Sequence, residues 1–239
     1  MAVAALRELR EKLDRHFPDA TPVPRRTTDG VATGIAALDA VLPNGGFPKG
    51  RLSVWTPNGG ATAVLRAACL SVIGRQERAA WIDGQGTMAG PWWEGGPVLI
   101  RPRSRVHALR AAEVLLRSGG FALVVVTGVE PEGTENVRLS RAAHDGGSAI
   151  VALTPNGATA ALKMSSSIAP DEYVWLRGPF GEPATVDSVA VHVRVNALGW
   201  NRRTRLVLPV SWHVVRSAMS PLLADRRGMT RPAALRMSA

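Results

Sequence analysis

The chain has 239 residues, of which 46% are hydrophobic, and a formal net charge of +10 at pH 7. This length and composition fit one α/β domain with a sizeable core and short additions at its ends. No run of about 18 uninterrupted apolar residues is present, so no membrane-spanning helix is expected. A single cysteine, Cys69, cannot form an internal disulfide, and the N-terminus has no apolar signal region. Both features predict a cytoplasmic protein.

The excess of positive charge has two interpretations. A polyanionic partner such as DNA, or an acidic protein surface, would account for it. A GC-rich genome would account for the preference for arginine, because lysine occurs only at Lys12, Lys49 and Lys163. Codon bias explains the choice of arginine but not the excess over acid, so the charge favours a partner that is DNA or an acidic protein surface.

The first 28 residues indicate a helix followed by a linker. Leu6, Leu9 and Leu13 recur at helical spacing, which predicts an amphipathic helix over residues 1–17. Residues 18–28 contain three prolines and two adjacent arginines, and they predict an extended arm. Such a helix either docks on a partner or folds back onto its own domain, and the sequence leaves both open.

Residues 29–215 are expected to form the core, because strand and helix patterns alternate there. The apolar run at 121–126 is typical of a strand buried on both faces of a parallel sheet. Strands are expected at 51–55, 79–82, 97–100, 121–126 and 149–153, and helices at 61–73, 104–117 and 135–144.

The last third of the chain changes character. A strand is expected at 173–176, and the alternating valines from Val189 to Val195 predict a half-exposed strand. A turn at 196–201 and a returning strand at 204–210 would complete an antiparallel hairpin. Residues 216–239 are rich in arginine and are expected to form a basic tail.

The strand at 51–55 runs into a Gly-rich turn that opens a helix, which is where P-loop proteins bind phosphate. Their motif is G-x-x-x-x-G-K-[ST], in which the Lys contacts phosphates and the hydroxyl holds magnesium. In one register Thr56 and Ala61 replace the two glycines and Thr62 replaces the Lys. In the next register Gly60 is the second glycine, Ala61 replaces the Lys and Thr62 supplies the hydroxyl.

Neither register supplies a cation for the phosphates. Gly59 and Gly60, following Asn58, still offer a small backbone nest for an anion. Without the Lys, tight binding of a triphosphate is not expected. No cofactor is expected, and the five dispersed histidines lack metal-ligand spacing.

The chain resembles RecA over about residues 1–210. The segment Val31–Asp39, the Gly-Gly-x-Pro-x-Gly-Arg run from Gly45 to Arg51, and the degenerate loop follow the order and spacing of the RecA core. The resemblance implies a RecA-like α/β fold, with a mostly parallel twisted sheet flanked by helices and a C-terminal antiparallel hairpin. It also places Gln85 at the position of the catalytic Glu and Thr127 at that of the magnesium-side Asp.

Three parts of the hydrolytic machinery are therefore expected to be missing, and no ATPase activity is expected. The segments 129–135 and 154–159 are also much shorter than the two loops with which RecA grips single-stranded DNA. A RecA-type filament on DNA is accordingly not expected.

Among RecA-like proteins, the chain looks most like the ImuA family. Its length, the run Trp175–Pro179 and the hairpin followed by a basic tail carry this resemblance. The resemblance implies a non-catalytic accessory protein in SOS-induced translesion DNA synthesis and mutagenesis. The implied partners are ImuB, which is an inactive Y-family polymerase homologue, an error-prone C-family polymerase and RecA, with DNA bound weakly or indirectly near the nucleoid.

The residues expected to bind partners lie at the two ends of the chain: Leu6, Leu9, Leu13, Arg226, Arg227, Arg231 and Arg236. Whether the tail arginines bind DNA or protein is open. Two alternative functions also stay open. One is a division inhibitor resembling SulA, which would bind a tubulin-like protein, and the other is a recombination mediator that still uses nucleotide.

Several other side chains have both a functional and a structural interpretation. Trp92 and Trp93 would stack on bases or anchor a partner if exposed, but packing onto the core is the better account. Arg194, Arg203 and Arg205 either face DNA phosphates or lie on a solvated sheet face. The carboxylates of Asp39, Asp83, Glu130 and Glu132 are interpreted as loop caps or solvated groups.

Overall fold

The computed structural model describes residues 29–88, 95–155, 160–197 and 200–209. The expected N-terminal helix and linker, the tail, and the boundaries at residues 17 and 215 lie outside the described residues. The same is true of Leu6, Leu9, Leu13, the four tail arginines and the pair Trp92 and Trp93. No helix in the described part is long and apolar enough to cross a membrane.

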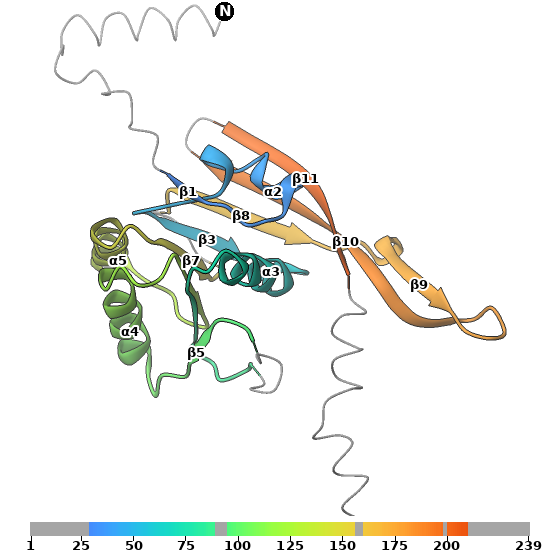
Figure 1. Ribbon diagram of the computed structural model, residues 1–239, viewed down its shortest axis with the longest axis horizontal. Helices are drawn as coiled ribbons and strands as arrows, with labels where there is room; N and C mark the ends of the chain where they lie inside the picture. The colour runs from blue at the N-terminus through green and yellow to red at the C-terminus, as the bar shows by residue number, and fades with distance from the viewer. Residues whose placement is uncertain (1–28, 89–94, 156–159, 198–199, 210–239) are drawn as a thin grey trace, which may run out of the picture.

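A large sheet organises the molecule (Figure 1). Its strands lie in the order β11-β10-β8-β3-β7-β6-β4-β5, and β9 pairs with β10 outside this path. The strands are β3 (Leu52–Thr56), β4 (Ala79–Asp83), β5 (Val98–Ile100), β6 (Leu123–Thr127), β7 (Ala149–Leu153), β8 (Leu162–Ser167), β9 (Tyr173–Arg177), β10 (Pro183–Ala197) and β11 (Trp200–Pro209).

Strand directions divide the sheet into two parts. The pairs β8–β3, β3–β7, β7–β6, β6–β4 and β4–β5 are parallel, whereas β10 pairs antiparallel with β8, β9 and β11. This arrangement confirms the expected α/β fold with a parallel sheet and an appended antiparallel hairpin.

Three longer helices connect the parallel strands: α3 (Ala61–Gly74), α4 (Arg105–Arg117) and α5 (Gly133–Asp145). Short elements precede and interrupt this core: β1 (Gly30–Val31), α2 (Ala36–Asp39), η2 (Pro43–Gly45), β2 (Phe47–Pro48) and η4 (Pro170–Glu172). All three longer helices were expected, with ends within a few residues of those observed. α5 begins earlier than expected because Glu132 and Glu135 form a reciprocal capping box at its first turn.

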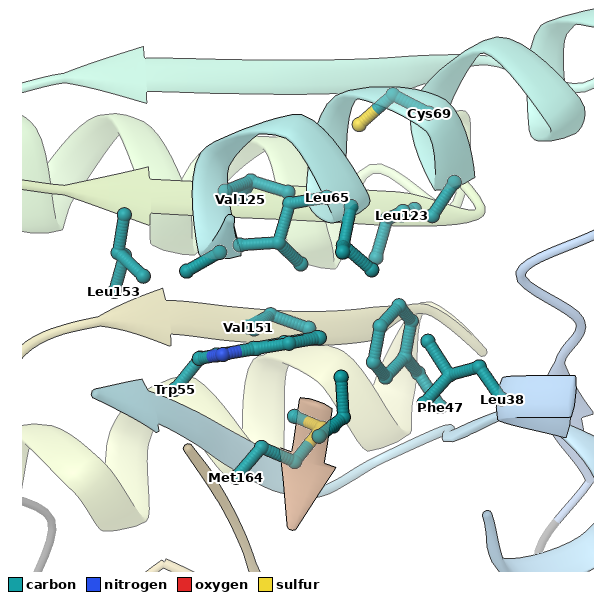
Figure 2. Packing of buried hydrophobic residues seen from close by; sticks show 14 of the residues in the cluster. Leu38, Phe47, Trp55, Leu65, Cys69, Leu123, Val125, Val151, Leu153 and Met164 are labelled. Carbon is teal, nitrogen blue, oxygen red and sulfur yellow. The ribbon is translucent and has the colours of Figure 1, made fainter. Parts of the chain in front are cut away.

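The two faces of the sheet bury separate apolar clusters. Under α3 the cluster includes Trp55, Leu65 and Cys69, which Figure 2 shows packed with Phe47 and Leu38. Burial there raises the pKa of the Cys69 thiol to about 12, so this thiol is protonated at neutral pH. The second cluster lies under α4 and α5.

Strand β6 confirms the expectation of a strand buried on both faces. Leu123 and Val125 belong to the α3 cluster, and Val124 and Val126 belong to the cluster under α4 and α5. Because successive side chains of a strand point to opposite faces, only a continuous apolar run satisfies both clusters.

The C-terminal hairpin differs from the expectation in two respects. Asn196 pairs with Asn201 and Ala197 with Trp200, so the expected turn over 196–201 is wrong and only residues 198–199 connect the strands. Strand β10 also starts at Pro183, six positions before Val189, and this earlier part pairs with β9. The sequence does not indicate this earlier part, because residues 183–188 are exposed or half-buried on both faces and apolar and polar residues therefore need not alternate there.

Candidate functional site

The carboxyl ends of β3, β4, β6 and β7 meet at one edge of the sheet, because these strands are parallel. In open α/β sheets this edge is where ligands bind. A pocket of about 400 Å³ lies there. It is lined by residues that end or follow these strands or open α3: Pro57, Thr62, Gln85, Thr87, Met88, Thr127, Gly128, Val129, Glu130, Leu153, Thr154 and Pro155.

The glycine-rich turn between β3 and α3 forms one wall of this edge. Gly60 precedes the first residue of α3 and has φ 84°, in the left-handed region. A Cβ on Gly60 would lie 2.7 Å from Cγ1 of Val191, and one on Gly59 would lie 3.3 Å from Ile168. The turn is therefore packed against β10 and the segment that follows β8, with no room for a side chain at Gly60.

The position at which α3 begins distinguishes the two possible registers of the phosphate loop. Gly60 caps the helix and Ala61 is its first residue. The glycine immediately before the helix is thus Gly60, which favours the register in which Ala61 replaces the Lys. Thr56 ends β3, and the Asn58 N–H donates to the Thr56 carbonyl at 2.8 Å. Pro57 of this turn and Thr62 of the first turn of α3 line the pocket.

Thr62, Gln85 and Thr127 come from three separate elements, and the structure brings them together in this pocket. The Thr127 hydroxyl accepts from Nε1 of Trp81 at 3.3 Å and donates to the Ile82 carbonyl at 3.2 Å. These bonds hold it against β4. Gln85 is exposed and packs on Gly128, where a Cβ would lie 2.3 Å from its Cγ.

The described lining of the pocket carries little charge. Its described lining contains one carboxylate, Glu130, and no Lys or Arg. Arg101 lies outside this lining and donates to the Met88 carbonyl. Within the described ranges, no group of three or more His, Cys, Asp or Glu is arranged to hold a metal ion.

Asp83 was expected to be a solvated carboxylate or a cap. It is buried at 1% exposure, so the solvated alternative is wrong. One carboxylate oxygen caps the loop after β4 by accepting from the Met88 N–H at 2.8 Å, and the other has no hydrogen-bond partner among the described residues. Asp39 also caps a turn, by accepting from the Thr33 N–H and hydroxyl and from the Gly34 N–H.

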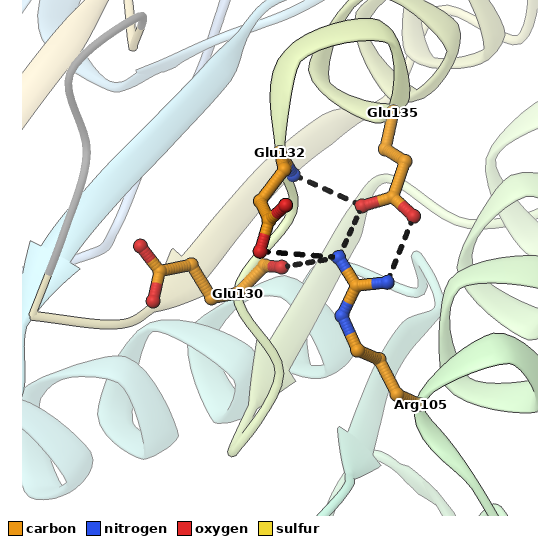
Figure 3. Close-up of polar contacts among 4 residues, drawn as sticks. All are labelled: Arg105, Glu130, Glu132 and Glu135. Carbon is orange, nitrogen blue, oxygen red and sulfur yellow. Dashed lines mark hydrogen bonds and ion pairs between the residues drawn. The ribbon is translucent and has the colours of Figure 1, made fainter.

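The loop after β6 is short, as expected, and Figure 3 shows the contacts that hold it. Arg105, at the start of α4, donates to the Glu130 carbonyl and to Oε1 of Glu135, both at 2.9 Å. Its guanidinium also lies 3.9 Å from a carboxylate oxygen of Glu132. Burial alone would raise the pKa of Glu135, but the hydrogen bond from Arg105 and the backbone bond from Glu132 outweigh it and lower the pKa.

The sequence identified Thr62, Gln85 and Thr127, but not the rest of the pocket. Met88, Glu130 and Thr154 follow β4, β6 and β7, respectively. Their positions just beyond buried apolar strands were the available signal, since the carboxyl ends of parallel strands share an edge.

A second exposed feature is a two-stranded arm made of β9, the turn Gly178–Glu182 and residues 183–188 of β10. It projects away from the helices (Figure 1). Large apolar side chains are exposed along it: Tyr173 38%, Val174 55%, Trp175 49%, Leu176 50% and Phe180 95%. The Trp175–Pro179 run therefore lies on the surface of this arm rather than in the core.

Comparison with known proteins finds partial similarity to RecA. RecA of Lactobacillus acidophilus is 35% identical over 107 residues, which are 41% of this chain and 30% of the relative. RecA of Thermus thermophilus is 29% identical over 118 residues, which are 45% of this chain and 34% of the relative. The chain thus spans about a third of the length of the curated relatives it matches.

No protein-family model matches the chain. The similarity to RecA and the strand order nevertheless agree, and the core is a RecA-like α/β fold.

Proposed function

We propose that this protein is a non-catalytic, RecA-like accessory factor in SOS-induced translesion DNA synthesis and mutagenesis, working at the nucleoid through contacts with other proteins. In this proposal the pocket at the carboxyl ends of the strands does not hydrolyse ATP. The partners are an ImuB-type polymerase homologue, an error-prone C-family polymerase and RecA. Similarity to RecA supports the RecA-like part of the proposal. The resemblance to the ImuA family supports the role in translesion synthesis and the named partners.

The observation that carries the proposal is the composition of the pocket. ATP brings several negative charges, and P-loop enzymes neutralise them with a Lys and a magnesium ion. The described lining here offers Thr62, Gln85 and Thr127 at the expected catalytic edge, together with the carboxylate of Glu130. Glu130 adds no positive charge to the lining, and neither Gln85 nor Thr127 can act as a general base at neutral pH.

The exposed arm supports the second part of the proposal, which is action through protein contacts. Apolar side chains that protrude together mark interaction sites more often than isolated ones do. Trp175 and Tyr173 lie with ring centroids 6.4 Å apart, and aromatic side chains are enriched among interface hot spots. The arm also carries the run by which the chain resembles the ImuA family.

Nucleotide binding and hydrolysis test the absence of catalysis. The full chain is titrated with a fluorescent ATP analogue and magnesium, and ATP turnover is measured with and without single-stranded DNA. RecA serves as the positive control at the same concentration. We expect neither saturable binding nor turnover. Saturable binding with turnover above the background of a Gln85→Ala variant would overturn the proposal.

Partner binding tests the second part of the proposal, which is action through contacts with other proteins. The full chain and a Trp175→Ala/Leu176→Ala variant are used as bait for purified ImuB homologue, C-family polymerase and RecA. Val106→Ala/Val137→Ala is the matched control, since both valines are 69% exposed and lie on α4 and α5, respectively. We expect the arm variant to lose at least one of these partners while the control retains all. Binding of a tubulin-like division protein instead would support the SulA-type alternative.

A further inference from the structure

Within the described part of the chain, no α-helix covers one face of the sheet along β8, β10 and β11. Val54 of β3 lies opposite Lys163 of β8 and belongs to the apolar cluster under α5, so these two side chains share a face of the sheet. On that face α4 and α5 lie against the other half of the sheet (Figure 1). Lys163, Arg194 and Arg203 are exposed beyond them, whereas Val193 and Val195 are buried on the opposite face.

The strand register arranges this surface in three rows, each running across β8, β10 and β11. The rows are Ser167–His192–Arg205, Ser165–Arg194–Arg203 and Lys163–Asn196–Asn201. We call these nine residues the basic face. Every side chain in it is polar, and four of the nine are Lys or Arg.

The middle of the basic face concentrates like charges. Arg194 and Arg203 stand directly opposite each other, and Lys163 is diagonal to Arg194. Side chains directly opposite in a sheet are about 5 Å apart at Cβ, and like charges in such pairs are destabilising. Within the described part of the chain, no carboxylate forms a salt bridge with any of these three cations.

The row Ser167–His192–Arg205 differs from the other two, because a carboxylate lies beside its charged side chains. Glu172 lies 2.6 Å from Arg205 and 2.8 Å from Nε2 of His192, so a carboxylate already neutralises that row. These hydrogen bonds lower the pKa of Glu172 to about 2. The interpretation of Arg205 as a contact for DNA is therefore not supported, whereas Arg194 and Arg203 keep their charge available, and Lys163 joins them.

We propose that the basic face binds the phosphodiester backbone of a nucleic acid, with Lys163, Arg194 and Arg203 as the principal contacts. Protein interfaces need an apolar centre and are depleted of charge there, and the basic face has no apolar side chain in its three rows. Nucleic-acid backbones are bound by Arg and Lys with Ser and Asn donors, which is the composition of this face. The net charge of +10 favours the same partner.

The chemistry also sets the mode of binding. Backbone contacts of this kind position a nucleic acid without reading its sequence. Affinity is therefore expected to depend strongly on salt and weakly on sequence. This site is separate from the pocket and the arm, so it stands whether or not the function proposed above is correct.

The test is fluorescence anisotropy of labelled single-stranded DNA and of a matched duplex, titrated with the full chain between about 50 and 200 mM salt. The variant is Lys163→Ala/Arg194→Ala/Arg203→Ala. The matched control is Arg103→Ala/Arg110→Ala/Arg141→Ala, which removes three exposed arginines on or beside α4 and α5 and thus has the same net charge. Circular dichroism establishes that both variants are folded.

We expect the basic-face variant to bind single-stranded DNA at least about tenfold more weakly than the control. Its salt dependence should be shallower by about 2 in log K against log salt, since each lost phosphate contact removes about 0.7. Equal affinity and slope in the two variants would overturn the proposal, as would a wild-type chain that does not bind DNA at low salt. Binding of polyglutamate but not of DNA, lost in the same variant, would assign the face to an acidic protein instead and would also overturn it.

Discussion

Replacing Gly60 by alanine tests whether the glycine-rich turn is kept for packing. Gly60 has φ 84°, and a left-handed conformation costs an L-residue about 1–2 kcal/mol. The added Cβ would also lie 2.7 Å from Cγ1 and 2.8 Å from Cγ2 of Val191, which is buried at 0% exposure. Overpacking of this kind costs about 1–3 kcal/mol. The sum predicts that Gly60→Ala lowers the free energy of unfolding by about 2–5 kcal/mol.

Gly45→Ala separates the two contributions. Gly45 has φ 70°, but a Cβ there would meet nothing within 4 Å, so only the backbone cost of about 1–2 kcal/mol applies. Unfolding in urea, followed by tryptophan fluorescence and circular dichroism, measures both variants. A further variant, Val191→Ala in the Gly60→Ala background, removes the obstructing methyl groups and should recover part of the loss relative to Val191→Ala alone.

Equal destabilisation by Gly60→Ala and Gly45→Ala, with no coupling to Val191, would refute this reasoning. The expected result would explain how a phosphate-loop glycine persists in a chain without the Lys of the motif. The glycine is required because β10 lies against the turn, and this requirement is independent of any nucleotide.

Three further predictions follow from individual contacts. Ser166→Ala removes the acceptor for the buried Nε1 of Trp55 at 3.1 Å and should cost about 1–3 kcal/mol in urea unfolding. Trp55→Phe should lessen this cost in the double variant. Glu172→Gln should reduce stability near pH 7 and lose its effect in acid. The reason is that the folded pKa of about 2 lies below the ordinary 4.5, so the stabilisation is present above pH 4.5 and disappears as the pH falls toward 2. Thermal melts across this range measure the difference. Arg203→Ala should raise the melting temperature slightly, because it removes a like charge opposite Arg194, and an unchanged or lower value would contradict the repulsion.

The sequence alone determined the elements whose residues have only one suitable environment. The run at 121–126 is apolar at every position, so it fits only a strand covered on both faces, and the structure confirms it as β6. The helix after the glycine-rich turn and the alternating valines of β10 were equally clear, because their periods of 3.6 and 2 residues do not overlap.

Local pattern failed where a residue's environment is set by a distant segment. Strand β10 extends back to Pro183 because β9 supplies its partner there, and no periodicity records that pairing. The burial of Asp83 likewise depends on the Met88 N–H, which the loop after β4 brings to one of its carboxylate oxygens.

The same distinction between local pattern and tertiary structure applies to the candidate sites. Spacing within the phosphate-loop motif identified Thr62, and the resemblance to RecA indicated Gln85 and Thr127. Only the parallel arrangement of β3, β4 and β6 gathers the three into one pocket. Arg194 and Arg203 were visible as charges, yet their opposition across the hairpin and the nearness of Lys163 follow from register. Composition and period decide which side chains a strand carries, whereas hydrogen-bonded register between distant strands decides which of them meet.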